Sequence, residues 1–150
     1  MLQLIYWSRA VRPFSDKELT SLLAKARANN ESLGVTGMLV HHRGEFLQVL
    51  EGPEATVLTL FETISADARH ADVCELVRLN VAERGFAEWS MGFFNADRQA
   101  LAKTPGFADF FGAGFSRPRF AADPSLAARL LKHFRSGTLA VNAVLEPAAV

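Results

Sequence analysis

Three polar side chains lie in segments whose other residues are typical of buried structure, and they are the candidates for chemistry. The segment FLQVLEG (46–52) has strand character with an amide, Gln48, at its centre. Because alternate residues of a strand share a face, Gln48 is expected to point into the core with its apolar neighbours. Tyr6 has a similar position in LQLIYWS (2–8), and Asn30 continues the apolar stripe of a predicted helix. The sequence therefore predicts inward-facing hydrogen-bonding groups.

A tyrosine and two amides on one side of a sheet could bind a flat heteroaromatic ligand. Burying an amide without a partner costs about 1–3 kcal/mol, so each group needs a hydrogen bond. Taken singly, each could satisfy a backbone group of the core. Tyr6 and Gln48, however, are expected side by side on strands predicted to be parallel neighbours, beneath the gap between two helices. A slot with apolar walls and a few convergent polar groups suits such a ligand.

Other kinds of site find little support in the sequence. It contains no phosphate-binding loop, dinucleotide fingerprint, nucleophile elbow or zinc-protease motif. Cys74 has no clear catalytic partner. His41 and His42 are adjacent in a predicted strand and face opposite sides, so they cannot both bind one metal ion from one face. We expect no metal site and no enzyme active site of these types.

The composition is that of one folded domain. The chain has 150 residues, of which 49% are hydrophobic and 21% charged. Its 16 basic and 16 acidic residues balance, which gives no reason to expect binding to nucleic acid or to an anionic membrane. No apolar run approaches the roughly 20 residues that span a bilayer. A single cysteine and the lack of a signal-peptide pattern predict a cytoplasmic protein.

Hydrophobic periodicity predicts the element order β-α-β-β-α-β-β. One helix is expected to start at the capping box Ser15–Glu18 and to end at Gly34, and another to follow Pro53. The predicted strands cover 2–8, 35–42, 45–51, 73–81 and 88–94. This order matches an α+β, ferredoxin-like split βαβ fold with a five-stranded mixed sheet and two helices on one face.

The strands are apolar on both sides, so the second face of the sheet also needs a cover. Eight of the twelve phenylalanines lie from Phe93 onward. A helix is predicted there with Asp123 as its N-cap and an apolar side that includes Leu126, Leu130 and Leu131. We expect residues 95–150 to form a helical extension that packs on the sheet face away from the first two helices, or that contacts other chains.

Five motifs in register give the sequence a family resemblance. In chain order they are LIYWS, ARANNESLGVTGML, EFLQVLEGP, the DARH segment and FAEWSM. Their order and intervals resemble those of the BLUF family of flavin-binding blue-light sensors, from about Leu2 to Phe94. The tail resembles that of short, stand-alone members. The resemblance implies that residues 1–94 form a flavin-binding domain, with FAD as the expected flavin and FMN as the alternative.

The resemblance also implies roles for residues around the flavin ring. Tyr6 would donate an electron to the photoexcited flavin, and Gln48 would lie between Tyr6 and the N5/O4 edge of the ring. Asn30 would hydrogen-bond the carbonyl edge of the ring, and Asn29 beside it would contribute to the pocket. Ligand binding is thereby assigned to the same three polar residues that the strand and helix patterns point inward.

A second group of positions matches the part of the family site near the ribityl chain and the phosphate. These positions are Asp67, Arg69 and His70, in the loop after the second helix. The charge-assisted donors of an arginine suit a phosphate. A solvated turn would equally account for Arg69 and His70.

A third group matches the residues whose arrangement around the glutamine responds to light. It consists of Ser8, Trp89 and Met91. Each also has a simpler explanation, because Trp89 could be plain core and Met91 could fill a gap in the packing.

We therefore expect a blue-light photoreceptor and not an enzyme. Light would drive electron and proton transfer from Tyr6, after which Gln48 rotates or tautomerises. With no output domain after the tail, the signal would pass in trans to a separate protein, and a homo-oligomer is expected. The rival functions are a small ferredoxin-like enzyme acting on an aromatic substrate and a plain interaction module.

Overall fold

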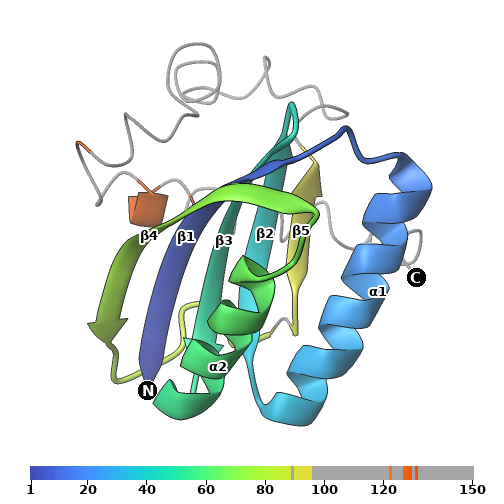
Figure 1. Ribbon diagram of the computed structural model, residues 1–150. Helices are drawn as coiled ribbons and strands as arrows, with labels where there is room; N and C mark the ends of the chain where they lie inside the picture. The colour runs from blue at the N-terminus through green and yellow to red at the C-terminus, as the bar shows by residue number, and fades with distance from the viewer. Residues whose placement is uncertain (89, 96–121, 123–126, 130, 132–150) are drawn as a thin grey trace.

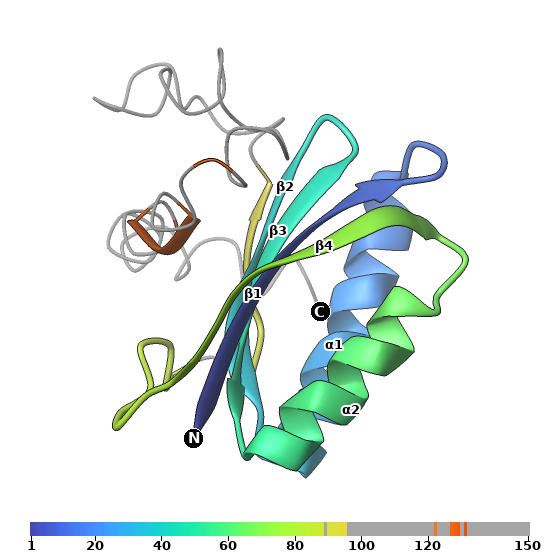
Figure 2. The same ribbon diagram turned by 60° about the vertical axis from the view of Figure 1, so that its left-hand side comes forward.

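The computed structural model describes residues 1–88, 90–95, 122, 127–129 and 131. Five strands form one sheet in the order β4-β1-β3-β2-β5, and two helices cover one of its faces (Figures 1 and 2). The predicted α+β fold is confirmed. In the described part of the chain, no helix is both long and apolar enough to cross a membrane. The elements are β1 (Leu2–Ala10), α1 (Asp16–Leu33), β2 (Thr36–His42), β3 (Glu45–Gly52), α2 (Glu54–Ser65), β4 (His70–Asn80) and β5 (Gly92–Asn95).

The strand directions correct one expectation. β1 pairs with β3 in antiparallel register, so the prediction of parallel neighbours is wrong. In a split βαβ unit the inserted strand, here β3, lies between the other two and runs antiparallel to both. The neighbour relation still holds, because Tyr6 and Gln48 are directly opposite one another in the β1–β3 ladder.

The last strand is shorter than predicted. The sequence predicted a strand over 88–94, whereas β5 begins at Gly92, where it pairs in parallel with Met38 of β2. The carbonyl groups of Ser90 and Met91 instead accept hydrogen bonds from side chains of α1, at 2.8 and 2.9 Å. Helix side chains thus take the place of a strand partner just before β5.

Local signals determine where α1 begins and ends. The predicted capping box is present: the Ser15 hydroxyl accepts from the Glu18 N–H, and the Glu18 carboxylate accepts from the Ser15 N–H. At the other end Gly34 has a φ of 70°, a left-handed conformation that glycine adopts readily. These two limits place Asn30 in the last turns of the helix, where it is buried.

The sheet has a hydrophobic cluster on each face. We call the side covered by α1 and α2 the helix face, and the opposite side the tail face. β1 contributes to both, with Leu4 and Tyr6 on the helix face and Ile5 and Trp7 on the tail face. This alternation follows from the two-residue period of a strand.

Residues of the predicted tail helix lie on the tail face. Ala127–Arg129 and Leu131 are helical, and Ala127 and Leu131 are buried in the same cluster as Trp7. Figure 2 shows this short segment, in orange, on the side of the sheet away from α1 and α2. The remaining predicted tail positions, including Asp123, lie outside the described residues, as does Trp89.

Replacement of Gly37 is expected to be strongly destabilising. A Cβ atom at this position of β2 would overlap the backbone carbonyl oxygen of Val49 on β3, and backbone cannot move aside cheaply. We expect Gly37→Ala to lower the free energy of unfolding by about 3 kcal/mol, measured by chemical denaturation. Gly85→Ala is the control, because its added Cβ would lie 3.6 Å from the nearest atom. Equal stability of the two variants would contradict the explanation.

Candidate functional site

A cavity of about 410 Å³ lies between the two helices and the helix face of the sheet. This volume falls in the range of small-molecule binding sites. All seven positions that the resemblance assigned to the cofactor contribute to its lining: Tyr6, Asn29, Asn30, Gln48, Asp67, Arg69 and His70. The structure therefore brings together residues from β1, α1, β3, the loop after α2 and the start of β4.

Most of the remaining wall is apolar and comes from the inner stripes of the helices and strands. Its apolar members are Leu22, Leu23 and Ala26 of α1, Leu60 and Ile64 of α2, and Leu39, Phe46 and Leu50 of the sheet. The helical residues recur every three or four positions, which places them on one side of each helix. A planar ring system could stack between such walls while its polar edge meets the buried amides.

The buried end of the cavity holds a chain of three side chains. The Tyr6 hydroxyl donates a hydrogen bond to Oε1 of Gln48. Nε2 of Gln48 lies 3.3 Å from Sδ of Met91 and donates to it. A thioether sulfur is a weak acceptor. Among the described residues, the amide oxygen of Gln48 therefore has a strong partner in Tyr6, whereas its amide donor has only the weak partner Met91.

The environment of Tyr6 keeps its hydroxyl protonated. The side chain is 1% exposed, and its ring packs against Phe61 of α2 with the ring centres 5.2 Å apart. Burial raises the pKa of Tyr6 far above its ordinary value, and the carboxylate of Asp67 raises it further. Tyr6 is therefore a hydrogen-bond donor to Gln48 across the physiological pH range.

Two side chains of α1 hold the segment that precedes β5. Nδ2 of Asn30 donates to the carbonyl of Ser90, and Nε of Arg27 donates to the carbonyl of Met91. Sequence reasoning singled out Asn30 but missed Arg27. The spacing of Arg27 could have identified it, because a residue three positions before Asn30 lies on the same side of the helix.

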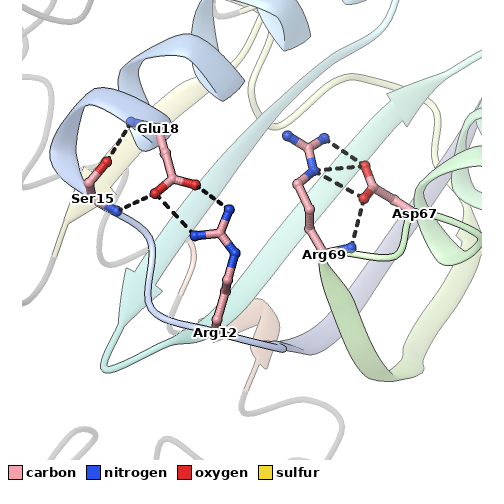
Figure 3. A network of polar contacts seen from close by, with 5 residues as sticks. All are labelled: Arg12, Ser15, Glu18, Asp67 and Arg69. Carbon is pink, nitrogen blue, oxygen red and sulfur yellow. Dashed lines mark hydrogen bonds and ion pairs between the residues drawn. The ribbon is translucent and has the colours of Figure 1, made fainter.

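Charged groups occupy the exposed end of the cavity lining. Nη2 of Arg69 lies 2.6 Å from Oδ2 of Asp67, which also accepts the backbone N–H of Arg69 through Oδ1 (Figure 3). These hydrogen bonds and the positive charge of Arg69 hold the pKa of Asp67 at about 2. Lys25 of α1, which sequence reasoning did not single out, also lines the cavity. Cationic groups at this end could meet an anionic part of a ligand.

A second charged group lies near the start of α1. Arg12 binds the carboxylate of Glu18, which also takes part in the capping box with Ser15 (Figure 3). The carboxylate of Glu18 raises the pKa of Arg69 slightly, after the larger effect of Asp67. The start of α1 and the α2–β4 loop are therefore electrostatically connected at the same end of the sheet.

Ser8 and His70 form a pair beside the cavity. Ser8 is fully buried, and its Oγ lies 3.1 Å from Nδ1 of His70. Burial lowers the pKa of His70, with Asp67 acting in the opposite direction and Arg69 in the same one. The imidazole is therefore neutral at pH 7. His70 lines the cavity, whereas Ser8 supports it through this contact.

Comparisons with known proteins show the family of this chain. Residues 1–92 match the family described as BLUF, sensors of blue-light using FAD. Photoactivated adenylate cyclase subunit beta of Euglena longa is 36% identical over 107 residues, which is 71% of this chain and 12% of that protein. Subunit alpha of Euglena gracilis is 35% identical over 109 residues, 73% of this chain and 11% of that protein. The matched region thus spans only about an eighth of these curated relatives.

Solved structures with a similar fold include those of BlrB and BlrP1. The BLUF protein BlrB in its dark state has a TM-score of 0.68 and 28% identity, covering 85% of this chain and 96% of that one. BlrP1 of Klebsiella pneumoniae, in complex with FMN and cyclic diGMP, has a TM-score of 0.60 and 34% identity, covering 83% of this chain and 35% of that one.

The ion pair of Asp67 predicts a pH dependence of stability. Its folded-state pKa of about 2 lies below the ordinary aspartate pKa of 3.8, so the stabilising effect of the ion pair is full above the higher value and disappears as the pH falls toward 2. We expect the difference in unfolding free energy between the wild type and Asp67→Asn to be constant near neutral pH and to shrink under acid conditions. Chemical denaturation at a series of pH values measures it. Glu83→Gln, at an exposed position, is the control. A difference that stays constant into acid would contradict the prediction.

Proposed function

The chain belongs to the BLUF family, the sensors of blue light that use FAD, and we propose that it binds its flavin between α1 and α2 with the ring against Tyr6 and Gln48. The observation that carries this proposal is the hydrogen bond from Tyr6 to Gln48 at the buried end of the cavity. The apolar walls suit a ring system, and the amides of Gln48 and Asn30 suit its polar edge.

The photoreaction uses the redox chemistry of a tyrosine and the two-sided hydrogen bonding of an amide. When bound, the flavin supplies the absorption of blue light and an excited state that accepts one electron. Tyr6 gives up one electron together with its hydroxyl proton, which leaves along the hydrogen bond to Oε1 of Gln48. Both return to Tyr6 when the charges recombine, so no net oxidation occurs.

Gln48 is the element that changes state. Its amide has a donor and an acceptor at neighbouring atoms, so rotation or tautomerisation exchanges the group that faces Tyr6. Rotation breaks the hydrogen bond from Tyr6 to Oε1 and, on the other side of the amide, only a thioether contact at Met91, so the Nε2 side adds little to the barrier. We infer that the arrangement with Nε2 on Met91 belongs to the dark state. A bistable group of this kind is what a switch requires.

The remaining site residues bind and orient the flavin. Asn30, with Asn29 beside it, faces the carbonyl edge of the ring. Arg69, with Asp67 and His70, serves the ribityl and phosphate part. FAD fits the family description, and FMN is the alternative cofactor.

We further infer that two parts of the chain have different functions. Residues 1–94 form the sensor, and residues 95–150 form an extension that carries the signal to a partner protein or to a second copy of the chain. Support comes from Ala127 and Leu131, which are buried against the tail face of the sheet. Ser8, Met91 and Trp89 are the proposed switch-coupled positions.

Removal of the amide is expected to abolish the light response. Blue light should shift the flavin absorption of the wild type to longer wavelength, with recovery in the dark. We expect Gln48→Leu and Tyr6→Phe to lose this shift while still binding flavin, because each removes one side of the hydrogen bond. A light-minus-dark absorption spectrum measures it.

Gln3→Leu is the matched control, since Gln3 lies on β1 outside the cavity lining. It should keep the shift. A normal shift in Gln48→Leu would refute the proposed switch. A wild-type protein that takes up no flavin would favour the interaction module, and bound flavin without a photocycle would favour the enzyme.

Arg69 is expected to strengthen the binding of flavins that carry a phosphate. Charge-assisted hydrogen bonds contribute about 1.5–3 kcal/mol, so Arg69→Gln should weaken binding of FAD and FMN by about tenfold or more. Riboflavin, which has no phosphate, should bind the variant and the wild type equally. Fluorescence titration of the apoprotein with the three flavins measures the effect. An equal loss for all three would assign Arg69 to the structure of the loop instead.

A further inference from the structure

A buried carboxylate near the end of β3 holds the chain that connects β4 to β5. Glu51 is fully buried, and its two carboxylate oxygens accept the backbone N–H groups of Gly85 and Phe86 at 2.7 and 2.9 Å. A buried carboxylate is unfavourable unless it is hydrogen-bonded, and bonds to an ionised acceptor are among the stronger ones in proteins. Glu51 therefore anchors this connection firmly to the sheet.

Arg84 strengthens the same anchor from the other side. Its guanidinium donates to Thr36 Oγ1 at 2.8 Å, to the carbonyl of Glu51 at 3.1 Å and to the carbonyl of Gly34 at 2.7 Å. The last turn of α1 contains no basic residue, so Arg84 brings a positive charge to the negative end of that helix. Residues 84–86 are thus bound to β3, to the start of β2 and to the end of α1.

The other end of the connection is fixed in the proposed flavin site. Gly92 enters the ladder opposite Met38, and Met91 just before it accepts from Gln48. The short segment between Phe86 and Gly92 therefore joins two fixed points. Phe86 is buried in the tail-face cluster, whereas Met91 is buried in the helix-face cluster. The segment connects the two sides of the sheet.

We propose that Glu51 is a positioning residue for the light response, which rests on the proposed function of this site. By fixing Gly85 and Phe86, it holds Met91 where its sulfur meets Nε2 of Gln48. The anchor favours the dark arrangement of the amide, and it makes a displacement of Met91 act on Phe86 and on the tail residue Leu131 packed in the same cluster. Without the anchor, the segment would adapt locally and the dark arrangement would be less favoured.

The test compares Glu51→Gln with the wild type in the flavin-loaded full chain. Glutamine keeps the shape and one acceptor oxygen but directs an NH2 donor toward a backbone N–H. We expect dark recovery to slow by about tenfold, because weakening of a charge-assisted bond removes part of the bias toward the dark state. Flavin affinity should stay within about twofold. A merely structural role would lower stability without changing the recovery rate.

A second variant and a second measurement make the test independent of how Glu51→Gln folds. Arg84→Gln, at a half-buried position, should slow recovery in the same direction. Amide hydrogen exchange in the dark should be faster across residues 84–92 in both variants. Glu75→Gln is the matched control, because its carboxylate pairs with Arg78 on β4 at a part-exposed position away from the connection. It should match the wild type in both measurements.

The outcomes separate this inference from the proposed function. Recovery within about twofold of a wild type that has a normal photocycle, in both Glu51→Gln and Arg84→Gln, would overturn the inference alone. Unchanged hydrogen exchange across residues 84–92 would also overturn it. A wild type without any light-induced shift would overturn the proposed function, and this inference with it.

Discussion

Gln48 lies opposite Tyr6 in the β1–β3 ladder and is buried, so its amide oxygen and its amide N–H groups both need hydrogen-bond partners from the surrounding fold. Tyr6, kept protonated by burial, uses the acceptor oxygen of Gln48, and the part of the chain that the structure describes offers the two amide N–H donors no strong partner. Met91 supplies a thioether, the weakest acceptor that still prevents a complete loss of hydrogen bonding. A ligand edge in the cavity would offer these weakly held donors a better acceptor than the thioether.

The fold places Met91 there indirectly. Met91 belongs to no strand, and its position depends on Arg27 and Asn30 of α1, on the β5 ladder that begins at the next residue, and on the anchor at Glu51. The antiparallel β1–β3 register sets Tyr6 against Gln48, while the chain between β4 and β5 supplies the third member. The segment from Phe86 to Gly92 is held at both ends, and it therefore connects the ligand cavity to the tail face of the sheet.

Several features could be predicted because their causes are local. The capping box at Ser15, the left-handed Gly34 and the alternation along β1 each depend on neighbouring residues. Other features have causes far away in the chain. β5 starts later than predicted because side chains of α1 bind the carbonyls of Ser90 and Met91, and no pattern within residues 88–94 encodes that competition. The relative direction of β1 and β3 likewise follows from how the whole split βαβ unit closes.

The sequence alone determined the element order, the amphipathic helices and the inward positions of Tyr6, Asn30 and Gln48, because each follows from side-chain periodicity and local capping. Together with the five motifs in register, it was also sufficient to indicate the family and its flavin. Only the tertiary structure decided which partners these groups have: Met91 for Gln48, Ser90 for Asn30, and Gly85 and Phe86 for Glu51. A hydrogen bond needs two groups within about 3 Å, and for residues tens of positions apart that distance is fixed by packing rather than by spacing.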